Sequence, residues 1–257
     1  MSPHSPVGAA AGQAWPPPVA VALDTGDLPT ALAWTQAVGP YVSTVKVGLE
    51  LYLRHGAIAV REIRAVGGHA VFLDLKLHDI PNTVAGAARS LAVLEPAYLS
   101  VHACGGAAMV RAAVQAVPGT LVTAVTVLTS LDGADLARAG FAGSPRDTVL
   151  RLATLAVQAG AGALVCSPQE VAAVRAEVGP DIVLVTPGVR PSPPSSASHQ
   201  PGERPPWDDQ ARVATAQQAI ADGADLLVVG RPLTAAADPA AAAAALAASL
   251  PPAAVRQ

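Results

Sequence analysis

The chain has 257 residues, of which 51% are hydrophobic, 14% are charged and 3% are aromatic, and its formal net charge is −3. This composition supports one large aliphatic core, and the lack of a basic surplus argues against a nucleic-acid partner. No apolar run reaches the roughly 18 residues of a membrane span. The N-terminus has neither the basic start nor the apolar core of a signal peptide, so we expect no association with a membrane.

The chain alternates between two kinds of segment after a Pro-, Ala-, Gly- and Ser-rich start over residues 1–18, which we expect to be a disordered extension. Short β-branched or apolar runs predict strands over 19–24, 42–47, 70–75, 98–102, 121–127, 163–166, 182–186 and 226–229. Ala-rich stretches with helical spacing predict helices over 30–38, 48–66, 83–94, 106–116, 146–159, 168–177, 215–221 and 239–250.

Strand–helix repetition with continuously apolar strands predicts a parallel sheet covered by helices. Eight such units suit a closed (β/α)8 TIM barrel, so we expect one α/β domain over residues 19–257. The alternative is an open doubly wound sheet. That fold usually has a Gly-rich turn after its first strand, whereas the first strand here ends at Asp24-Thr25-Gly26.

The segment 191–208 interrupts this rhythm, because it holds six prolines and several serines between the seventh strand and the next helix. It is longer than an ordinary βα loop. Two interpretations stay open, a tolerated disordered insertion and a mobile lid at the rim of the active site.

Two cysteines, Cys104 and Cys166, show neither metal spacing nor a disulfide framework, which is typical of a protein in a reducing cytoplasm. No set of His, Asp or Glu has the spacing of a metal site either, so we expect no metal.

Polar residues gather where the expected strands end, which is where a barrel of this type places its chemistry. Lys46 and Lys76 are the only lysines among 16 basic residues, and both fall at strand C-termini. Asp74 and Lys76 are two residues apart, so we expect them on one face of a strand, and Asp79 follows three residues later. The pattern predicts a compact site of alternating carboxylates and ammonium groups, with a structural salt-bridge network as the alternative.

A phosphate site is expected after the seventh and eighth strands, where this barrel usually binds phosphate. Arg190 ends a TPGVR turn after the seventh strand, and Gly230 and Arg231 follow the eighth. Glycine lets backbone N–H groups approach an anion, and an arginine fork can clamp it. Gln210, just beyond the long loop, is placed to close over the same group.

These motifs together resemble the orotidine 5′-phosphate decarboxylase family. The segment 74–83 (DLKLHDIPNT) looks like the signature of that family, and the segments ALD at 22–24, KVG at 46–48, VHA at 101–103 and VGRP at 229–232 follow in the family's order. The resemblance implies conversion of orotidine 5′-monophosphate to uridine 5′-monophosphate and CO2, without a cofactor, in a homodimer with shared active sites.

The resemblance also implies a role for each residue. Lys76 would protonate C6 as CO2 leaves, and Asp74 would lie against the substrate carboxylate. Lys46 and Asp79 would complete the charge network, with Asp79 and Thr83 coming from the neighbouring subunit. The substrate-binding residues would be Asp24 and Lys46 at the ribose, Thr129 at the pyrimidine, and Arg190, Gln210, Gly230 and Arg231 at the phosphate.

Two rival functions stay open. A sugar-phosphate decarboxylase or synthase of the same superfamily would share the Asp-x-Lys-x-x-Asp core at residues 74–79 and use Mg²⁺. A non-catalytic barrel is the other, although it should lack at least one of the four charged residues. Asp208, where the family usually has Gly before the Asp-Gln pair, and the long Pro-rich loop both depart from the family's pattern around the lid.

Overall fold

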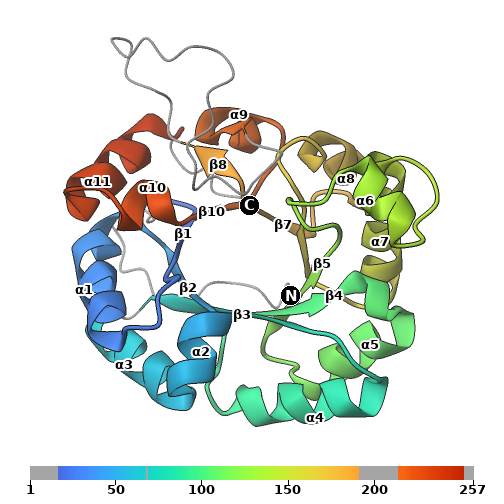
Figure 1. Cartoon of the computed structure of the whole chain (residues 1–257), viewed down its shortest axis with the longest axis horizontal. Coiled ribbons are helices and arrows are strands. Elements are labelled where there is room, and N and C mark those ends of the chain that lie inside the picture. Colours follow the sequence, from blue (N-terminus) through green and yellow to red (C-terminus); the bar gives the residue numbers. More distant parts are fainter. Residues whose placement is uncertain (1–16, 68, 191–213, 252–257) are drawn as a thin grey trace.

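The computed structural model describes residues 17–67, 69–190 and 214–251. Within these ranges the chain forms a closed barrel of parallel strands in the order β1-β10-β7-β6-β5-β4-β3-β2, surrounded by helices (Figure 1). The predicted (β/α)8 TIM barrel is therefore confirmed. The barrel strands are β1 (Val19–Ala22), β2 (Thr44–Gly48), β3 (Ala70–Leu77), β4 (Tyr98–His102), β5 (Leu121–Val125), β6 (Ala163–Val165), β7 (Val183–Thr186) and β10 (Leu226–Val229).

Helices follow the strands on the outside of the barrel. They are α1 (Leu28–Val38), α2 (Leu49–His55), α3 (Ala57–Gly67), α4 (Pro81–Ala92), α5 (Ala107–Ala116), α6 (Gly133–Arg138), α7 (Pro145–Gln158), α8 (Val171–Val178), α9 (Ala216–Ala221), α10 (Arg231–Thr234) and α11 (Pro239–Ser249). Two single 3-10 turns, η1 (Gly39–Tyr41) and η2 (Ala103–Gly105), and a parallel pair of short strands, β8 (Val189–Arg190) and β9 (Ala214–Thr215), complete the described elements.

The structure differs from the predicted helices in two ways, since one predicted helix is split and short helices were missed. The helix expected over 48–66 is two helices, because Gly56 adopts a φ of 59° between them, a conformation that ends a helix and suits glycine. Helix α6 was not predicted, since its six residues are too few to show an apolar period. Its start is nevertheless encoded by a capping box between Asp132 and Asp135.

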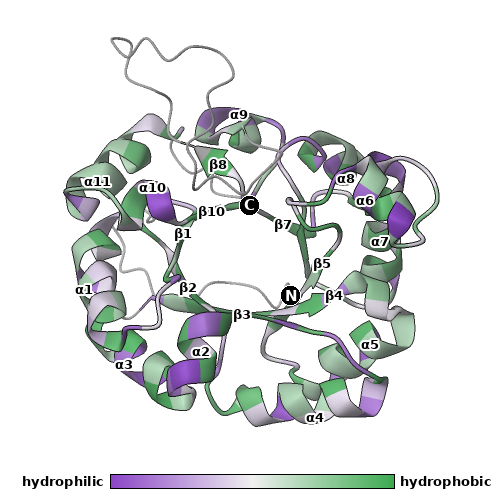
Figure 2. Cartoon of the chain, viewed as in Figure 1, coloured by the Kyte–Doolittle hydropathy of each residue, from purple (hydrophilic) through white to green (hydrophobic). Residues whose placement is uncertain are grey.

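The strands are apolar on both faces, so the barrel has an inner and an outer core (Figure 2). Alternate residues such as Leu99 and Val101 pack outward against the helices. The inward residues below the site include Ala20, Phe72 and Val185, all with at most 1% exposure. Because the barrel interior is filled at this level, it is closed from below and open at the C-terminal ends of its strands.

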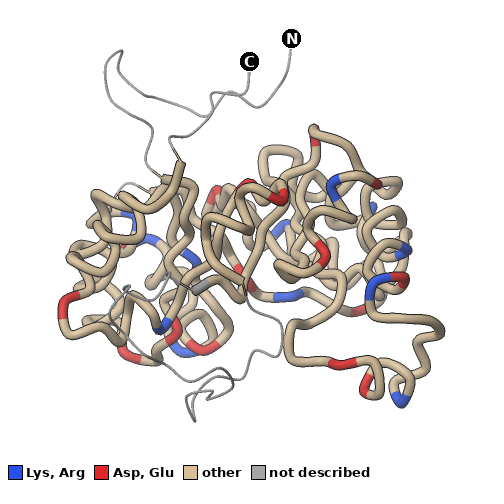
Figure 3. The backbone as a smooth tube through the Cα atoms, turned by 90° about the horizontal axis from the view of Figure 1, so that it is seen from above, with Lys and Arg blue, Asp and Glu red and all other residues tan. Residues whose placement is uncertain are grey.

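Charged residues of both signs are interspersed along the chain (Figure 3). Over the described ranges, no helix combines the length and apolar character needed to cross a membrane.

Several expectations concern residues outside the described ranges, namely residues 1–16 of the extension expected over 1–18, the loop 191–208 and Gln210. Residues 17 and 18 are described, and the carbonyl of Pro18 accepts a hydrogen bond from the Leu227 N–H of β10 at 2.9 Å.

Candidate active site

A cavity of about 430 Å³ opens at the C-terminal ends of the barrel strands. This volume is within the range of small-molecule sites. Its lining combines a row of charged side chains with an apolar wall and consists of Ala22, Asp24, Lys46, Phe72, Asp74, Lys76, Val125, Val127, Leu128, Thr129, Val165, Val185, Pro187, Val228, Gly230, Arg231 and Pro232.

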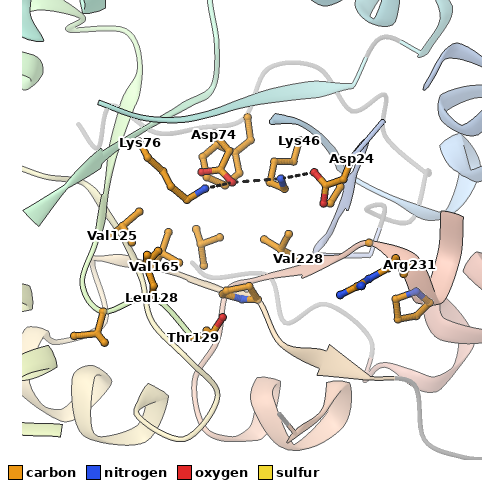
Figure 4. Close-up of a pocket in the computed structure, with 17 residues that line it drawn as sticks. Asp24, Lys46, Asp74, Lys76, Val125, Leu128, Thr129, Val165, Val228 and Arg231 are labelled. Atoms are coloured by element: carbon orange, nitrogen blue, oxygen red, sulfur yellow. Dashed lines mark hydrogen bonds and ion pairs between the residues drawn. The ribbon is translucent and has the colours of Figure 1, made fainter. Parts of the chain in front are cut away.

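Four charged side chains form a continuous row along one wall of the cavity (Figure 4). Lys76 Nζ lies 2.8 Å from Asp74 Oδ2, and Lys46 Nζ lies 3.3 Å from the same oxygen. Lys46 Nζ also donates to Asp24 Oδ1 at 3.1 Å. Carboxylates and ammonium groups alternate in this row as predicted, but its second carboxylate is Asp24, which follows β1, and not Asp79.

In this row, burial and the neighbouring charges shift the pKa values of Lys46 and Asp74 in opposite directions. The Lys46 side chain is only 9% exposed, and this burial lowers its pKa, yet the carboxylates of Asp74 and Asp24 raise that pKa above its usual value. Burial likewise raises the pKa of Asp74, but Lys46, Lys76 and a hydrogen bond from Ser100 bring it below its usual range. Lys46 and Asp74 therefore both stay ionised near neutral pH, because the charge of each offsets the free-energy cost of burying the other.

Lys76 lies within an irregularity of β3. Leu73 pairs with Leu99 and Leu77 with Val101, so β3 advances by four residues while β4 advances by two. Within this bulge Lys76 has a φ of 49°, in the left-handed region that side chains other than glycine rarely adopt. Phe72, Asp74 and Lys76 nevertheless all line the cavity, so the alternation expected of a strand is kept, and the Lys76 ammonium group lies beside Asp74.

The wall opposite the charged row is apolar (Figure 4). Val125, Val165 and Val228 face the row across the cavity, and Phe72 also lines it. Arg231 lies toward the Asp24 end of the row, while Leu128 lies toward the Lys76 end. The cavity thus has one end with an exposed guanidinium and another that combines an ammonium group with apolar side chains.

Asp79 and Thr83 lie outside the cavity of the single chain. Both are exposed, and the Asp79 carboxylate accepts a hydrogen bond from its neighbour Ile80 N–H at 2.6 Å. Ile80 itself is 66% exposed, although it is a large apolar residue. The predicted contribution of Asp79 and Thr83 to a neighbouring subunit's site stays a prediction.

The expected phosphate residues are only partly described. Gly230, Arg231 and Thr129 all line the cavity. The backbone of Arg190 lies in β8, but its side chain and Gln210 are outside the described part of the chain.

His102, at the end of β4, packs against His78 with a ring-centroid distance of 5.4 Å. Burial lowers the pKa of His102, and the positive charges of His78 and Lys76 lower it further, while Asp74 opposes them. Among the residues that the structure describes, no three His, Cys, Asp or Glu side chains are grouped so that they could hold a metal ion.

Residues 17–246 match the model of the orotidine 5′-phosphate decarboxylase / HUMPS family. The chain belongs to this family. The match spans most of the sequence and includes every strand of the barrel and all four residues of the charged row.

Curated relatives named orotidine 5′-phosphate decarboxylase are similar over nearly their whole length. A protein of Thermobifida fusca (strain YX) is 63% identical over 233 residues, which is 91% of this chain and 95% of the relative. One of Frankia casuarinae is 52% identical over 250 residues, which is 91% of this chain and 87% of the relative. Among solved structures, the orotidine 5′-phosphate decarboxylase of Lactobacillus acidophilus aligns with a TM-score of 0.73 at 34% identity and covers 89% of this chain and 96% of that one.

Sequence reasoning missed two parts of the site. One is the apolar wall, whose valines look like any other residues of a buried strand. The other is Ser100, which is fully buried and contacts both Asp74 and Lys76. A usable signal was present, because Ser100 is the central residue of an otherwise apolar run, two positions from the strand end at His102.

Proposed function

We propose that this chain decarboxylates orotidine 5′-monophosphate to uridine 5′-monophosphate and CO2 without a cofactor, as a step of pyrimidine biosynthesis. The row Lys76–Asp74–Lys46–Asp24 along a cavity with an opposite apolar wall is the observation that supports it most directly. The names of the similar curated proteins favour the same reaction over that of a sugar-phosphate enzyme.

The chemistry assigned to Lys76 follows from its ammonium group beside Asp74. When the bond from C6 to the carboxylate carbon breaks, its electron pair stays on C6 and CO2 leaves. A proton then passes from Lys76 Nζ to C6, which completes uridine 5′-monophosphate, and the neutral amine regains a proton from water. A fixed ammonium at this place stabilises the developing negative charge in the transition state and afterwards neutralises it.

Asp74 has the complementary role. Its carboxylate accepts from both lysines and is only 12% exposed, so it is held in place where the substrate carboxylate would approach. Two carboxylates in one site repel each other, and departure of CO2 relieves that repulsion. The valines opposite the row offer the departing CO2 an apolar surface rather than a competing hydrogen bond.

The remaining cavity residues would hold the substrate in register. Asp24 and Lys46 would contact the ribose, and Thr129 the pyrimidine. Arg231 and Gly230 would bind the phosphate together with Arg190 and Gln210. Binding energy from this remote phosphate would offset the cost of forcing two carboxylates together at the reacting end.

We further propose a cytoplasmic homodimer in which residues 19–257 form one decarboxylase domain and Asp79 and Thr83 of each subunit complete the partner's site. The exposed signature segment supports this arrangement, because Ile80 presents apolar surface between Asp79 and Thr83.

The reaction is tested by following the absorbance of orotidine 5′-monophosphate with purified protein in the presence of EDTA. Turnover that survives EDTA supports the proposal. Failure of the folded protein to consume this substrate would refute it, and turnover of sugar phosphates that depends on Mg²⁺ would favour the rival enzyme.

The shared site has a separate test, which is to mix Asp79→Ala subunits with Lys76→Ala subunits. Random pairing makes half of the dimers mixed, and each mixed dimer has one intact site, so about a quarter of the wild-type activity should return. Neither variant alone should show this recovery. Absence of recovery in dimers proven to be mixed would contradict a site built from two subunits.

A further inference from the structure

Ser100 forms hydrogen bonds with two residues of the charged row, Asp74 and Lys76. Its hydroxyl donates to Asp74 Oδ1 at 2.9 Å and accepts from the Lys76 backbone N–H at 2.8 Å. Ser100 is 0% exposed and is absent from the lining of the cavity, so the substrate does not reach it. The hydroxyl therefore acts on the site only through Asp74 and Lys76.

Ser100 faces the interior of the barrel. On β4 the residues Leu99 and Val101 pack into the outer core, while Tyr98 packs into the inner one. Ser100 follows the inward alternation and lies between Asp74 of β3 and its register partner Thr123 of β5. A buried hydroxyl is costly unless it is hydrogen-bonded, and here its donor and one acceptor position are both used within the site.

The two hydrogen bonds fix different features. The bond to Asp74 Oδ1 leaves Oδ2 to accept from Lys46 and Lys76, so it sets the rotation of the carboxylate. The bond from the Lys76 N–H satisfies a backbone donor that the bulge removes from the regular pairing of β3 with β4. It also holds Lys76 at its unfavourable φ of 49°.

We propose that Ser100 is a positioning residue for the decarboxylation, which aligns the Asp74 carboxylate and the Lys76 ammonium group through these two hydrogen bonds. This inference rests on the proposed function and assigns a further residue to it. It predicts that loss of the hydroxyl slows the chemical step more than it weakens ligand binding, since Ser100 touches neither the substrate nor the phosphate end of the cavity.

Thr123 provides a matched control. It is also 0% exposed and lies on the neighbouring strand β5, but its hydroxyl donates to the Leu121 carbonyl of its own strand at 3.1 Å. This hydrogen bond does not involve the charged row, although Thr123 is the register partner of Ser100. Ser100→Ala and Thr123→Val therefore each remove one buried hydroxyl from adjacent strands, and only the first removes the hydrogen bonds to Asp74 and Lys76.

The experiment compares wild type, Ser100→Ala, Ser100→Thr and Thr123→Val in steady-state decarboxylation of orotidine 5′-monophosphate, with thermal melting to verify folding. We expect Ser100→Ala to lower kcat by about 10- to 100-fold, the loss typical of hydrogen bonds to charged groups. Its KM and the inhibition constant of uridine 5′-monophosphate should change less than about threefold. Ser100→Thr, which keeps the hydroxyl, should recover most of kcat, and Thr123→Val should retain it.

The pH profile gives a second readout that a purely structural role would not move. The Ser100 hydroxyl favours the ionised form of Asp74 and so lowers its pKa. Without it, the acid limb of the kcat profile should shift to higher pH in Ser100→Ala but not in Thr123→Val.

Three results would overturn the inference. One is a kcat of Ser100→Ala within about threefold of wild type, and another is an equal loss in Thr123→Val, which would mean that any buried hydroxyl matters in the same way. The third is a wild-type protein that does not consume orotidine 5′-monophosphate, which would refute the proposed function as well. Active wild type with an active Ser100→Ala would refute the role of Ser100 alone.

Discussion

The ion pair between Arg175 and Asp225 lies far from the cavity, so its loss should lower the stability of the barrel without lowering its activity. Arg175, on α8, donates to the carbonyls of Gly179 at 2.6 Å, Ile182 at 2.8 Å and Gly223 at 2.9 Å, and it pairs with Asp225. The two side chains are 18% and 14% exposed. The contacts lie where β7 and β10 begin, at the end of the barrel opposite the cavity.

Arg175→Met removes these donors, including the guanidinium that pairs with Asp225 in a mostly buried place. Breaking a buried pair by removing one partner costs about 3–5 kcal/mol, and we take about 3 kcal/mol because both side chains keep some exposure. For a domain of this size that corresponds to a fall in Tm of about 6–12 °C. Because the site is at the other end, kcat at 25 °C should stay within about twofold of wild type.

Arg138→Met is the matched control, since Arg138 forms an ion pair with Asp135 at 72% and 34% exposure. An exposed pair contributes about 0–1 kcal/mol, so Tm should fall by no more than about 4 °C. Thermal melting and decarboxylation assays on both variants provide the measurement. Equal effects on Tm in the two variants, or a tenfold loss of kcat in folded Arg175→Met, would refute the reasoning.

Three further substitutions test the site itself. In Gly48→Ala a Cβ would come 3.1 Å from Asp24 Oδ1 and 3.3 Å from Lys46 Nζ, so steady-state kinetics should show kcat/KM lowered by about tenfold with little change in Tm. Burial, more than any other cause, lowers the pKa of His102, so the folded state resists its protonation and the free energy of unfolding should fall as pH drops below about 6.5. Urea titrations should show that the free energy of unfolding falls less at low pH in His102→Asn than in wild type. An identical fall in the two proteins would contradict the assignment of this pH dependence to His102. Arg231→Met should raise KM for orotidine 5′-monophosphate by about 100-fold if the guanidinium binds phosphate, while kcat/KM for orotidine, which lacks the phosphate, should stay unchanged.

The barrel was predictable because its strands are short, apolar and evenly spaced. The strand predicted over 98–102 matches β4, and that over 226–229 matches β10. The helix predicted over 48–66 was wrong in the middle, since the apolar period continues across Gly56 and only the backbone geometry shows the break. Periodicity reports which side of a segment is apolar, and it is insensitive to a single residue with a positive φ.

The charged row was predictable in composition but not in geometry. Lys46, Asp74 and Lys76 were identified from their position at strand ends, and all three line the cavity. The bulge at Lys76 could not be predicted, because register depends on the pairing of β3 with β4. Ser100 escaped for the same reason, since its importance lies in contacts across two strands.

Lys76→Ala tests the central claim most directly, because it removes the proposed proton donor and leaves Asp24, Lys46 and Arg231 in place. The measurement is kcat for orotidine 5′-monophosphate together with the inhibition constant of uridine 5′-monophosphate. We expect kcat to fall at least about 10³-fold, as loss of both a charge-stabilising group and a general acid requires, while the product still binds within about tenfold of wild type. A folded Lys76→Ala protein whose kcat stays within tenfold of wild type would contradict the account.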